Sequence, residues 1–156
     1  MNAIILSIGD ELVLGQTIDT NSAWLSQQLA TVGVGALAHV TVADGQKPIE
    51  LAIRELSGRC DVLLISGGLG PTEDDLTRQA LSKVLGLPLE ENAQWLAELQ
   101  RFFEARGRAM PSINRIQAMI PRGAEMIFNT CGTAAGIRAT LDSAKCTVFA
   151  MPGVPK

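Results

Sequence analysis

One stretch of the chain combines glycines and carboxylates in a pattern that can bind phosphate. Residues 66–77 read SGGLGPTEDDLT and follow the short apolar run 61–65. The run predicts a buried parallel strand, and the residues after the glycines have helical spacing. Gly67, Gly68 and Gly70 let backbone N–H groups approach a ligand, while a helix N-terminus adds unpaired N–H groups and a partial positive charge. These features predict an anion site with phosphate as its natural ligand.

Three carboxylates, Glu73, Asp74 and Asp75, lie three to five residues after the last glycine of this loop. They would repel a bare phosphate, so either they face away from the ligand or a hard cation such as Mg²⁺ bridges them to it. A structural role is equally open, because Thr72 and Asp75 have the spacing of a capping box and acidic residues favour the first turn of a helix. Both roles of Asp75 remain open at this point, and they are compatible.

The surrounding segments predict how these residues are positioned. Apolar runs alternate with stretches of helical spacing, which predicts an α/β domain: three layers, a doubly wound and mostly parallel sheet, and helices on both faces. The predicted strands are 3–8, 34–43, 61–65, 125–128, 136–141 and 147–151. The predicted helices are 21–32, 48–56, 76–85, 90–107 and 111–119. At 156 residues, with 47% of them apolar, one domain spanning residues 1–156 is expected.

For two of the predicted helices, the sequence also indicates the capping residue or the buried face. Asn21 is the predicted N-cap of the first helix, and Leu25, Leu29 and Val32 are its predicted buried stripe. The helix 90–107 has an aromatic face around Trp95. That face is interpreted as core or subunit interface rather than as a cofactor site.

Carboxylates also follow the first two predicted strands. Asp10 and Glu11 come after the first strand and Asp44 after the second. Because ligands bind outside the carboxyl ends of parallel strands, these acids are expected to converge with the glycine loop on one crevice.

Composition excludes several classes of protein. The net charge is −3 and the basic residues are scattered, which argues against a nucleic-acid partner or an anionic membrane surface. No apolar run is long enough to cross a membrane and no signal sequence is evident, so a cytoplasmic protein is expected. The three cysteines lack C-x-x-C spacing and are interpreted as reduced and mostly buried. A single histidine, His39, gives little support for a catalytic triad.

Four motifs resemble one known family. Residues 67–77 match G-G-x-G-x-x-x-x-D-x-T, which is similar to the signature of the molybdopterin-binding domain of the MogA, MoaB and MoeA proteins. The opening GDEL at 9–12, the GTAAG at 132–136 and the MPGVP at 151–155 resemble the CinA group, the competence and damage inducible proteins. The resemblance covers essentially the whole chain, which would then be one domain of a longer CinA-type protein.

The resemblance implies two chemistries that both involve a phosphorylated ligand. The cofactor enzymes bind molybdopterin and adenylylate it with Mg-ATP, and their two acids would correspond to Asp44 and Asp75. The CinA group is associated with metal-dependent cleavage of ADP-ribose to AMP and ribose 5-phosphate. Ser66, Leu69 and Ala135 depart from the cofactor enzymes or from common CinA sequences, and on balance they favour the CinA branch. A homo-oligomer, dimer or trimer, is also implied.

The resulting hypothesis is a metal-dependent ADP-ribose pyrophosphatase; the alternatives are a molybdopterin-binding module without hydrolysis and an oligomerisation domain. The predicted catalytic residues are Asp44 and Asp75, and the predicted ligands of a divalent metal, Mg²⁺ by preference, are Asp10, Glu11, Asp74 and Asp75. The predicted ligand-binding residues are Ser66, Gly67, Gly68, Gly70, Thr72, Gly132, Thr133, Pro152 and Gly153.

Overall fold

The computed structural model of the protein describes residues 1–153, in which six strands form one sheet in the order β2-β1-β3-β8-β7-β6. The strands are β1 (Asn2–Ile8), β2 (Gly35–Val42), β3 (Val62–Ser66), β6 (Glu125–Ile127), β7 (Gly136–Leu141) and β8 (Cys146–Met151). β2, β1, β3 and β8 run parallel, and β7 is antiparallel to both of its neighbours. The predicted mostly parallel α/β sheet is therefore confirmed. Val154 and Pro155, at the end of the last predicted motif, lie outside the described residues.

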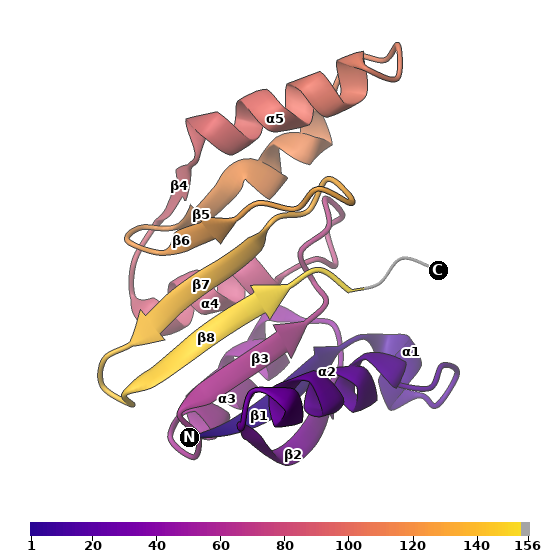
Figure 1. The fold of residues 1–156 in the computed structure, drawn as a ribbon. Helices are drawn as coiled ribbons and strands as arrows, with labels where there is room; N and C mark the ends of the chain where they lie inside the picture. Colours follow the sequence, from indigo (N-terminus) through magenta and orange to yellow (C-terminus); the bar gives the residue numbers. More distant parts are fainter. Residues whose placement is uncertain (154–156) are drawn as a thin grey trace.

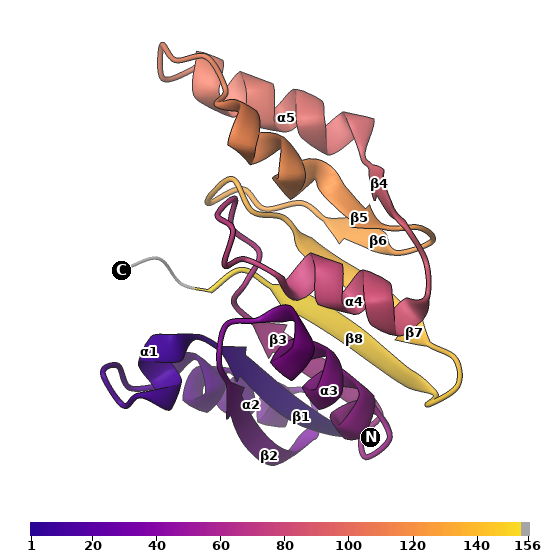
Figure 2. The ribbon, with the colours of Figure 1, turned by 180° about the vertical axis from the view of Figure 1, so that it is seen from behind.

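Helices lie on both faces of this sheet. α2 (Thr20–Thr31) covers one face, and α3 (Gln46–Ser57) and α4 (Thr77–Leu85) cover the other, as Figures 1 and 2 show from opposite sides. The main core lies under α3 and α4, because their apolar side chains repeat with helical spacing and face the sheet. A short helix, α1 (Asp10–Val13), follows β1. Within residues 1–153 no helix is long and apolar enough to cross a membrane.

α2 differs from the expectation in both its cap and its buried face. Its N-cap is Asp19, whose carboxylate accepts hydrogen bonds from the Ser22 N–H at 2.9 Å and from the Ser22 hydroxyl at 2.6 Å. The predicted cap, Asn21, was wrong. The predicted apolar stripe was also wrong at Val32, which is 72% exposed. Ser22 is instead the buried residue of α2, since its hydroxyl also lies 2.9 Å from that of Ser7 on β1. A polar network thus attaches this helix to the sheet.

A smaller lobe extends from the β6 edge of the sheet. It consists of β4 (Leu89–Glu91) paired with β5 (Met119–Pro121), α5 (Ala93–Glu104) and a 3-10 helix, η1 (Ser112–Ala118). The predicted helix 90–107 begins later than expected because β4 precedes it and Asn92 caps it. Trp95 is buried and stacks on Phe128 with ring centroids 5.2 Å apart. The aromatic face of α5 is therefore the core of this lobe.

The cysteines are free thiols, and two of the three are buried. Cys60 and Cys146 lie with their sulfur atoms 4.0 Å apart at the sheet end opposite the glycine loop. Burial raises the pKa of both thiols, that of Cys146 to about 12. Both are therefore poorly reactive, whereas Cys131 is exposed.

Candidate functional site

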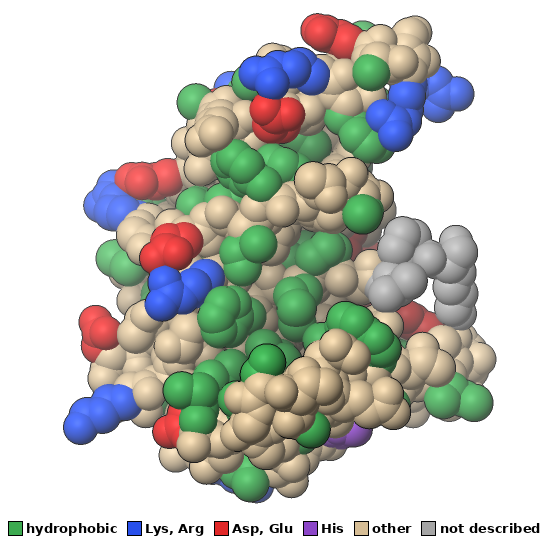
Figure 3. All heavy atoms as spheres, in the orientation of Figure 1, with side chains coloured by type: hydrophobic (Ala, Val, Ile, Leu, Met, Phe, Trp, Pro, Cys, Tyr) green, Lys and Arg blue, Asp and Glu red, His purple; other side chains and the backbone are tan. Residues whose placement is uncertain are grey.

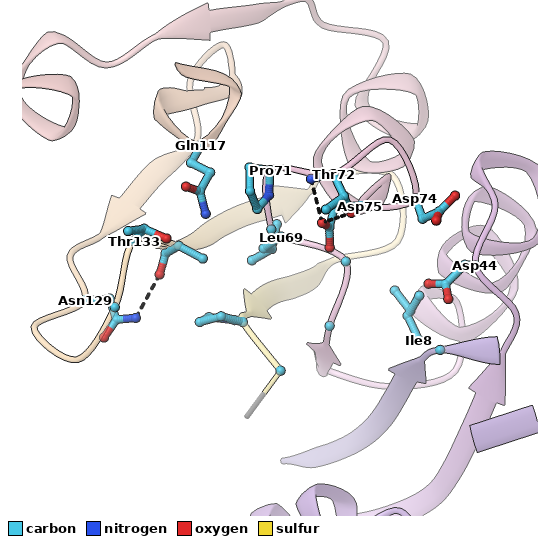
Figure 4. A pocket seen from close by; sticks show the side chains of 18 of the residues that line it. Ile8, Asp44, Leu69, Pro71, Thr72, Asp74, Asp75, Gln117, Asn129 and Thr133 are labelled. Carbon is cyan, nitrogen blue, oxygen red and sulfur yellow. Dashed lines mark hydrogen bonds between the residues drawn. The ribbon is translucent and has the colours of Figure 1, made fainter. Parts of the chain in front are cut away.

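A cleft of about 840 Å³ opens where β1, β2, β3 and β8 end. The glycine loop after β3 forms its floor. Asp44 and Asp74 lie on one side, and Gln117 and Thr133 lie on the other (Figure 4). The cleft therefore occupies the edge of the sheet that the order of the elements predicts for a ligand.

The glycines of this loop are required by close packing. Gly67 has φ +104°, and a Cβ there would lie 2.7 Å from the carbonyl oxygen of Ile8. Gly68 has φ +68°, and a Cβ there would lie 2.1 Å from the Thr77 hydroxyl. That hydroxyl donates to the Gly67 carbonyl at 2.8 Å, and the Thr77 N–H donates to the Gly68 carbonyl at 3.0 Å. The glycine-to-threonine spacing of the motif thus folds the loop onto the start of α4.

The loop presents backbone N–H groups to the cleft. Within residues 1–153 the N–H groups of Gly68, Leu69 and Gly70 have no hydrogen-bond acceptor. Successive free N–H groups of this kind form a concave anion site. The start of α4 contributes less than expected, because the Thr77 N–H is already bonded within the loop and no residue of α4 lines the cleft. The anion-binding capacity lies in the loop amides.

Arg78 supports the loop from behind, a role that sequence reasoning missed. Its side chain is 1% exposed and donates to the carbonyls of Leu69 at 2.6 Å and Gly70 at 3.2 Å. Burial lowers its pKa to about 10, although the nearby charge of Asp75 opposes the shift. Arg78 lies on the helix face of Leu81 and Leu85, three and seven residues later, but a charged side chain is normally expected to extend from such a position to solvent.

Asp75 is bound to the loop itself. Its Oδ2 accepts from the Thr72 N–H at 2.9 Å and from the Thr72 hydroxyl at 2.5 Å. A Cβ at Gly70 would lie 2.4 Å from the same oxygen, so the loop wraps closely around this carboxylate. The bond from carboxylate to backbone has the pattern expected of a capping box, but α4 begins only at Thr77. Residues 72–75 are therefore a turn before the helix and not its first turn.

Asp44 lies among other carboxylates. Asp10 and Asp44 each accept a hydrogen bond from the other's N–H, at 2.9 and 3.0 Å, which joins the loops after β1 and β2. Burial raises the pKa of Asp44, and the negative charges of Asp10, Glu11 and Asp74 raise it further. The hydrogen bond from the Asp10 N–H acts in the opposite direction and lowers this pKa. A region of negative potential therefore lies at this side of the cleft.

Most of the predicted site residues line the cleft. They are Glu11, Asp44, Gly67, Gly68, Gly70, Thr72, Asp74, Asp75, Gly132, Thr133, Pro152 and Gly153. Asp10 lies outside this lining and braces Asp44. Ser66 lines a neighbouring pocket of about 240 Å³ and accepts a hydrogen bond from Asn21 at 3.4 Å. In the part of the chain that the structure describes, no three His, Cys, Asp or Glu side chains form a preassembled metal site.

Two amide side chains of the cleft were missed. The Asn129 side chain donates to the Ala134 carbonyl at 2.9 Å and accepts from the Cys131 N–H at 2.8 Å, so it shapes the loop after β6. Gln117 reaches the cleft from η1. Sequence reasoning singled out neither residue. Gln117 lies in a segment that was predicted only as a helix, and Asn129 lies before the GTAAG motif in the loop after β6.

The comparisons with known proteins agree with this architecture. A family model described as "Probable molybdopterin binding domain" matches residues 4–156. A CinA-like protein from an Anaeromyxobacter species is 46% identical over 151 residues, which cover 97% of this chain and 36% of that protein. A CinA-like protein from Shewanella woodyi is 39% identical over 155 residues, 99% of this chain and 36% of that protein. The chain thus spans about a third of the length of these curated relatives.

Solved structures of related proteins have the same fold. CinA from Thermoplasma acidophilum, described as a protein of unknown function, superposes with a TM-score of 0.89 at 30% identity and covers 99% of this chain and 90% of that one. MoaB from Thermus thermophilus superposes with a TM-score of 0.62 at 22% identity, covers 99% of this chain and 82% of that one, and supports the fold alone. Since the family model and the Thermoplasma protein both match nearly the whole chain, the chain belongs to the molybdopterin-binding domain family, within its CinA group.

Proposed function

We propose that the cleft binds a nucleotide diphosphate together with a divalent cation and hydrolyses the pyrophosphate bond of ADP-ribose. One observation carries the proposal. Within residues 1–153 the side chains that line the cleft include four carboxylates and no Lys, Arg or His. The carboxylates are Glu11, Asp44, Asp74 and Asp75.

The charge balance of such a cleft requires a cation. Two like unit charges 4 Å apart repel by about 4 kcal/mol at the effective dielectric constant near a protein surface. The partial charges of the loop amides at Gly68 to Gly70 offset only part of this repulsion when a diphosphate binds. Mg²⁺ usually takes one or two protein carboxylates and completes its shell with water and substrate phosphates. The lack of a preassembled group of three acids therefore suits Mg²⁺ held jointly with the ligand.

The acidic residues in and beside the cleft have separate roles. Glu11 and Asp74, which lie near Asp44, supply carboxylates for Mg²⁺. Asp10 braces the loop that carries Asp44, and Asp75 holds the glycine loop through Oδ2 while its charge acts on the ligand or its cation. When bound, the cation would neutralise developing charge on the phosphates and lower the pKa of a water molecule. Asp44, whose pKa is raised, orients that water and accepts its proton more readily than an ordinary aspartate would.

The test is release of AMP from ADP-ribose, with Mg²⁺ and with EDTA. We expect Mg²⁺-dependent release that falls about a hundredfold or more in Asp44→Asn, because a preorganised charged group is lost. Asp142→Asn is the matched control, since Asp142 is an exposed acid in the turn after β7, away from the cleft. Equal release in EDTA, or full activity of Asp44→Asn, would contradict the proposal.

A second candidate function is a binding module that holds molybdopterin without hydrolysis. It is supported by the description of the matching family. In that case a phosphorylated pterin binds tightly, no AMP is released in the assay above, and Asp44→Asn changes affinity alone. In both candidates the partner is a small phosphorylated molecule.

A further inference from the structure

Gln117 places a buried amide at the wall of the cleft opposite the carboxylates. It lies near the end of η1 and its side chain is 2% exposed. In Figure 4 the side chain points from the lobe down into the cleft, above Thr133 and facing Leu69. A long polar side chain is seldom buried to this extent unless its hydrogen-bonding groups are used.

A hydrogen bond from a neighbouring residue orients this amide. The Asn114 side-chain amide donates to Gln117 Oε1 at 2.8 Å, and Asn114 is itself buried and lies outside the cleft lining. The oxygen of Gln117 is therefore occupied, and its Nε2 is directed to the cleft. Among residues 1–153 no hydrogen bond from this Nε2 to a protein acceptor is found, and Nε2 is not one of the fully buried unpaired atoms, so it is open to the cleft. A donor on a buried side chain that faces the cleft and has no protein acceptor is available to an acceptor on a ligand.

We infer that Gln117 Nε2 recognises a hydrogen-bond acceptor on the planar heterocycle of the ligand, a ring nitrogen or carbonyl of a purine or a pterin. The inference rests on the proposed function, because it requires the phosphate groups to lie at the glycine loop and the acids. The heterocycle then lies across the cleft, on the side of the lobe. Gln117 thus selects the ring, and the loop selects the phosphate.

The surroundings of the amide favour a ring over a second phosphate. Phe102 of α5 and the loop residues Leu69 and Pro71 also line the cleft. Apolar side chains with a few fixed polar groups are typical of sites for uncharged rings. A phosphate is normally bound by cations or by several N–H groups, and Gln117 offers one neutral amide group.

Two variants test this assignment from different directions. Gln117→Leu removes the donor and keeps a side chain of similar bulk. Asn114→Asp changes no residue of the cleft lining but replaces the amide donor with an acceptor. The new carboxylate would accept from Gln117 Nε2 and turn the amide oxygen towards the cleft. Arg115→Gln on the same 3-10 helix is the control, because its side chain is 63% exposed and pairs with Glu91.

The probes are AMP, neopterin monophosphate and inorganic pyrophosphate, each titrated calorimetrically with Mg²⁺ present. We expect the ring-bearing probe that the unaltered protein binds to lose about tenfold in affinity in Gln117→Leu and Asn114→Asp. Pyrophosphate should bind equally to all forms, which also establishes that the variants are folded. Which ring-bearing probe responds distinguishes a purine from a pterin.

Three results would overturn the inference: equal loss for ring-bearing probes and pyrophosphate, no loss for either, or unaltered protein that binds ring-bearing probes no more tightly than pyrophosphate. Failure of the proposed function is separate, because it would appear as absent metal-dependent AMP release from ADP-ribose. If that release is absent while AMP or the pterin still binds through Gln117, the hydrolase proposal fails and the inference stands.

Discussion

The two roles open to Asp75, holding the loop or acting on the ligand, can be separated by substituting each partner of its hydrogen bonds. The carboxylate accepts two bonds from Thr72, one from the N–H at 2.9 Å and one from the hydroxyl at 2.5 Å. Thr72→Val removes the hydroxyl and leaves the backbone bond and the carboxylate charge. Asp75→Asn keeps an acceptor for Thr72 and removes the charge.

The structure allows the size of each effect to be estimated. A hydrogen bond to a charged group contributes about 1.5–3 kcal/mol, and the Thr72 hydroxyl is exposed, so the lower end applies to its loss. If this were expressed fully as misplacement of the loop, AMP release would fall about tenfold in Thr72→Val. If Asp75 only holds the loop, Asp75→Asn should have a similar or smaller effect. If its charge acts on the ligand or its cation, the loss should reach about a hundredfold or more.

We expect the larger loss for Asp75→Asn, because Asp75 lines the cleft beside three other carboxylates and its charge can therefore act on a bound cation. The assay is kcat/KM for AMP release at several Mg²⁺ concentrations, with the double variant completing a cycle. Equal losses in Thr72→Val and Asp75→Asn that excess Mg²⁺ does not relieve would refute this reasoning. Asp75 would then be a positioning residue alone.

Three further predictions concern stability and assembly. Arg78→Met should lower the free energy of unfolding by only about 1–3 kcal/mol, because the loss of two charged hydrogen bonds is partly offset by relief of a buried cation; urea denaturation measures it. The pKa of Asp44 is raised in the folded protein, so folding favours the protonated form of this carboxyl group. The stability that the protonated form contributes is fully present below the unfolded-state pKa of 3.8 and is lost as pH rises through the folded-state pKa. Asp44→Asn should therefore melt higher than the unaltered protein at pH 7, and the difference should vanish near pH 3. Trp24 is 59% exposed on α2, which has no charged residue, and the surface there is largely uncharged in Figure 3. We therefore expect that α2 forms the interface of a homo-oligomer, and that the sedimentation coefficient falls in Trp24→Lys.

Sequence patterns predicted the elements whose buried residues recur with a regular spacing along the chain. α3 is the clearest case, since Ile49, Ile53 and Leu56 recur with helical spacing and all three are buried. The strands that end at the cleft were also predicted, because each is a short apolar run followed by glycine or acid. The order of these runs then determined which ends of the strands meet, and so predicted the position of the cleft.

The features that the sequence did not predict depend on contacts between distant segments. Arg78 is buried because the carbonyls of the glycine loop bend back over α4, and no spacing rule encodes that turn. Asp19 replaces Asn21 as the cap because it also bonds the Ser22 hydroxyl, which faces β1. Gln117 gained its position from the lobe formed by β4, β5 and α5, whose small sheet joins segments about 30 residues apart.

The glycine motif has two physical explanations, and they operate together. At Gly67 and Gly68 a side chain would collide with Ile8 and Thr77, so these glycines would be needed for folding even without a ligand. The same close packing turns the loop carbonyls towards Thr77 and Arg78, which leaves the opposite sides of the peptide groups, the N–H groups, facing the cleft. The motif therefore indicates an anion site because of how the loop packs. What distinguishes a hydrolase from a binding module is the carboxylates around that site, and substituting those residues is the experiment that discriminates between them.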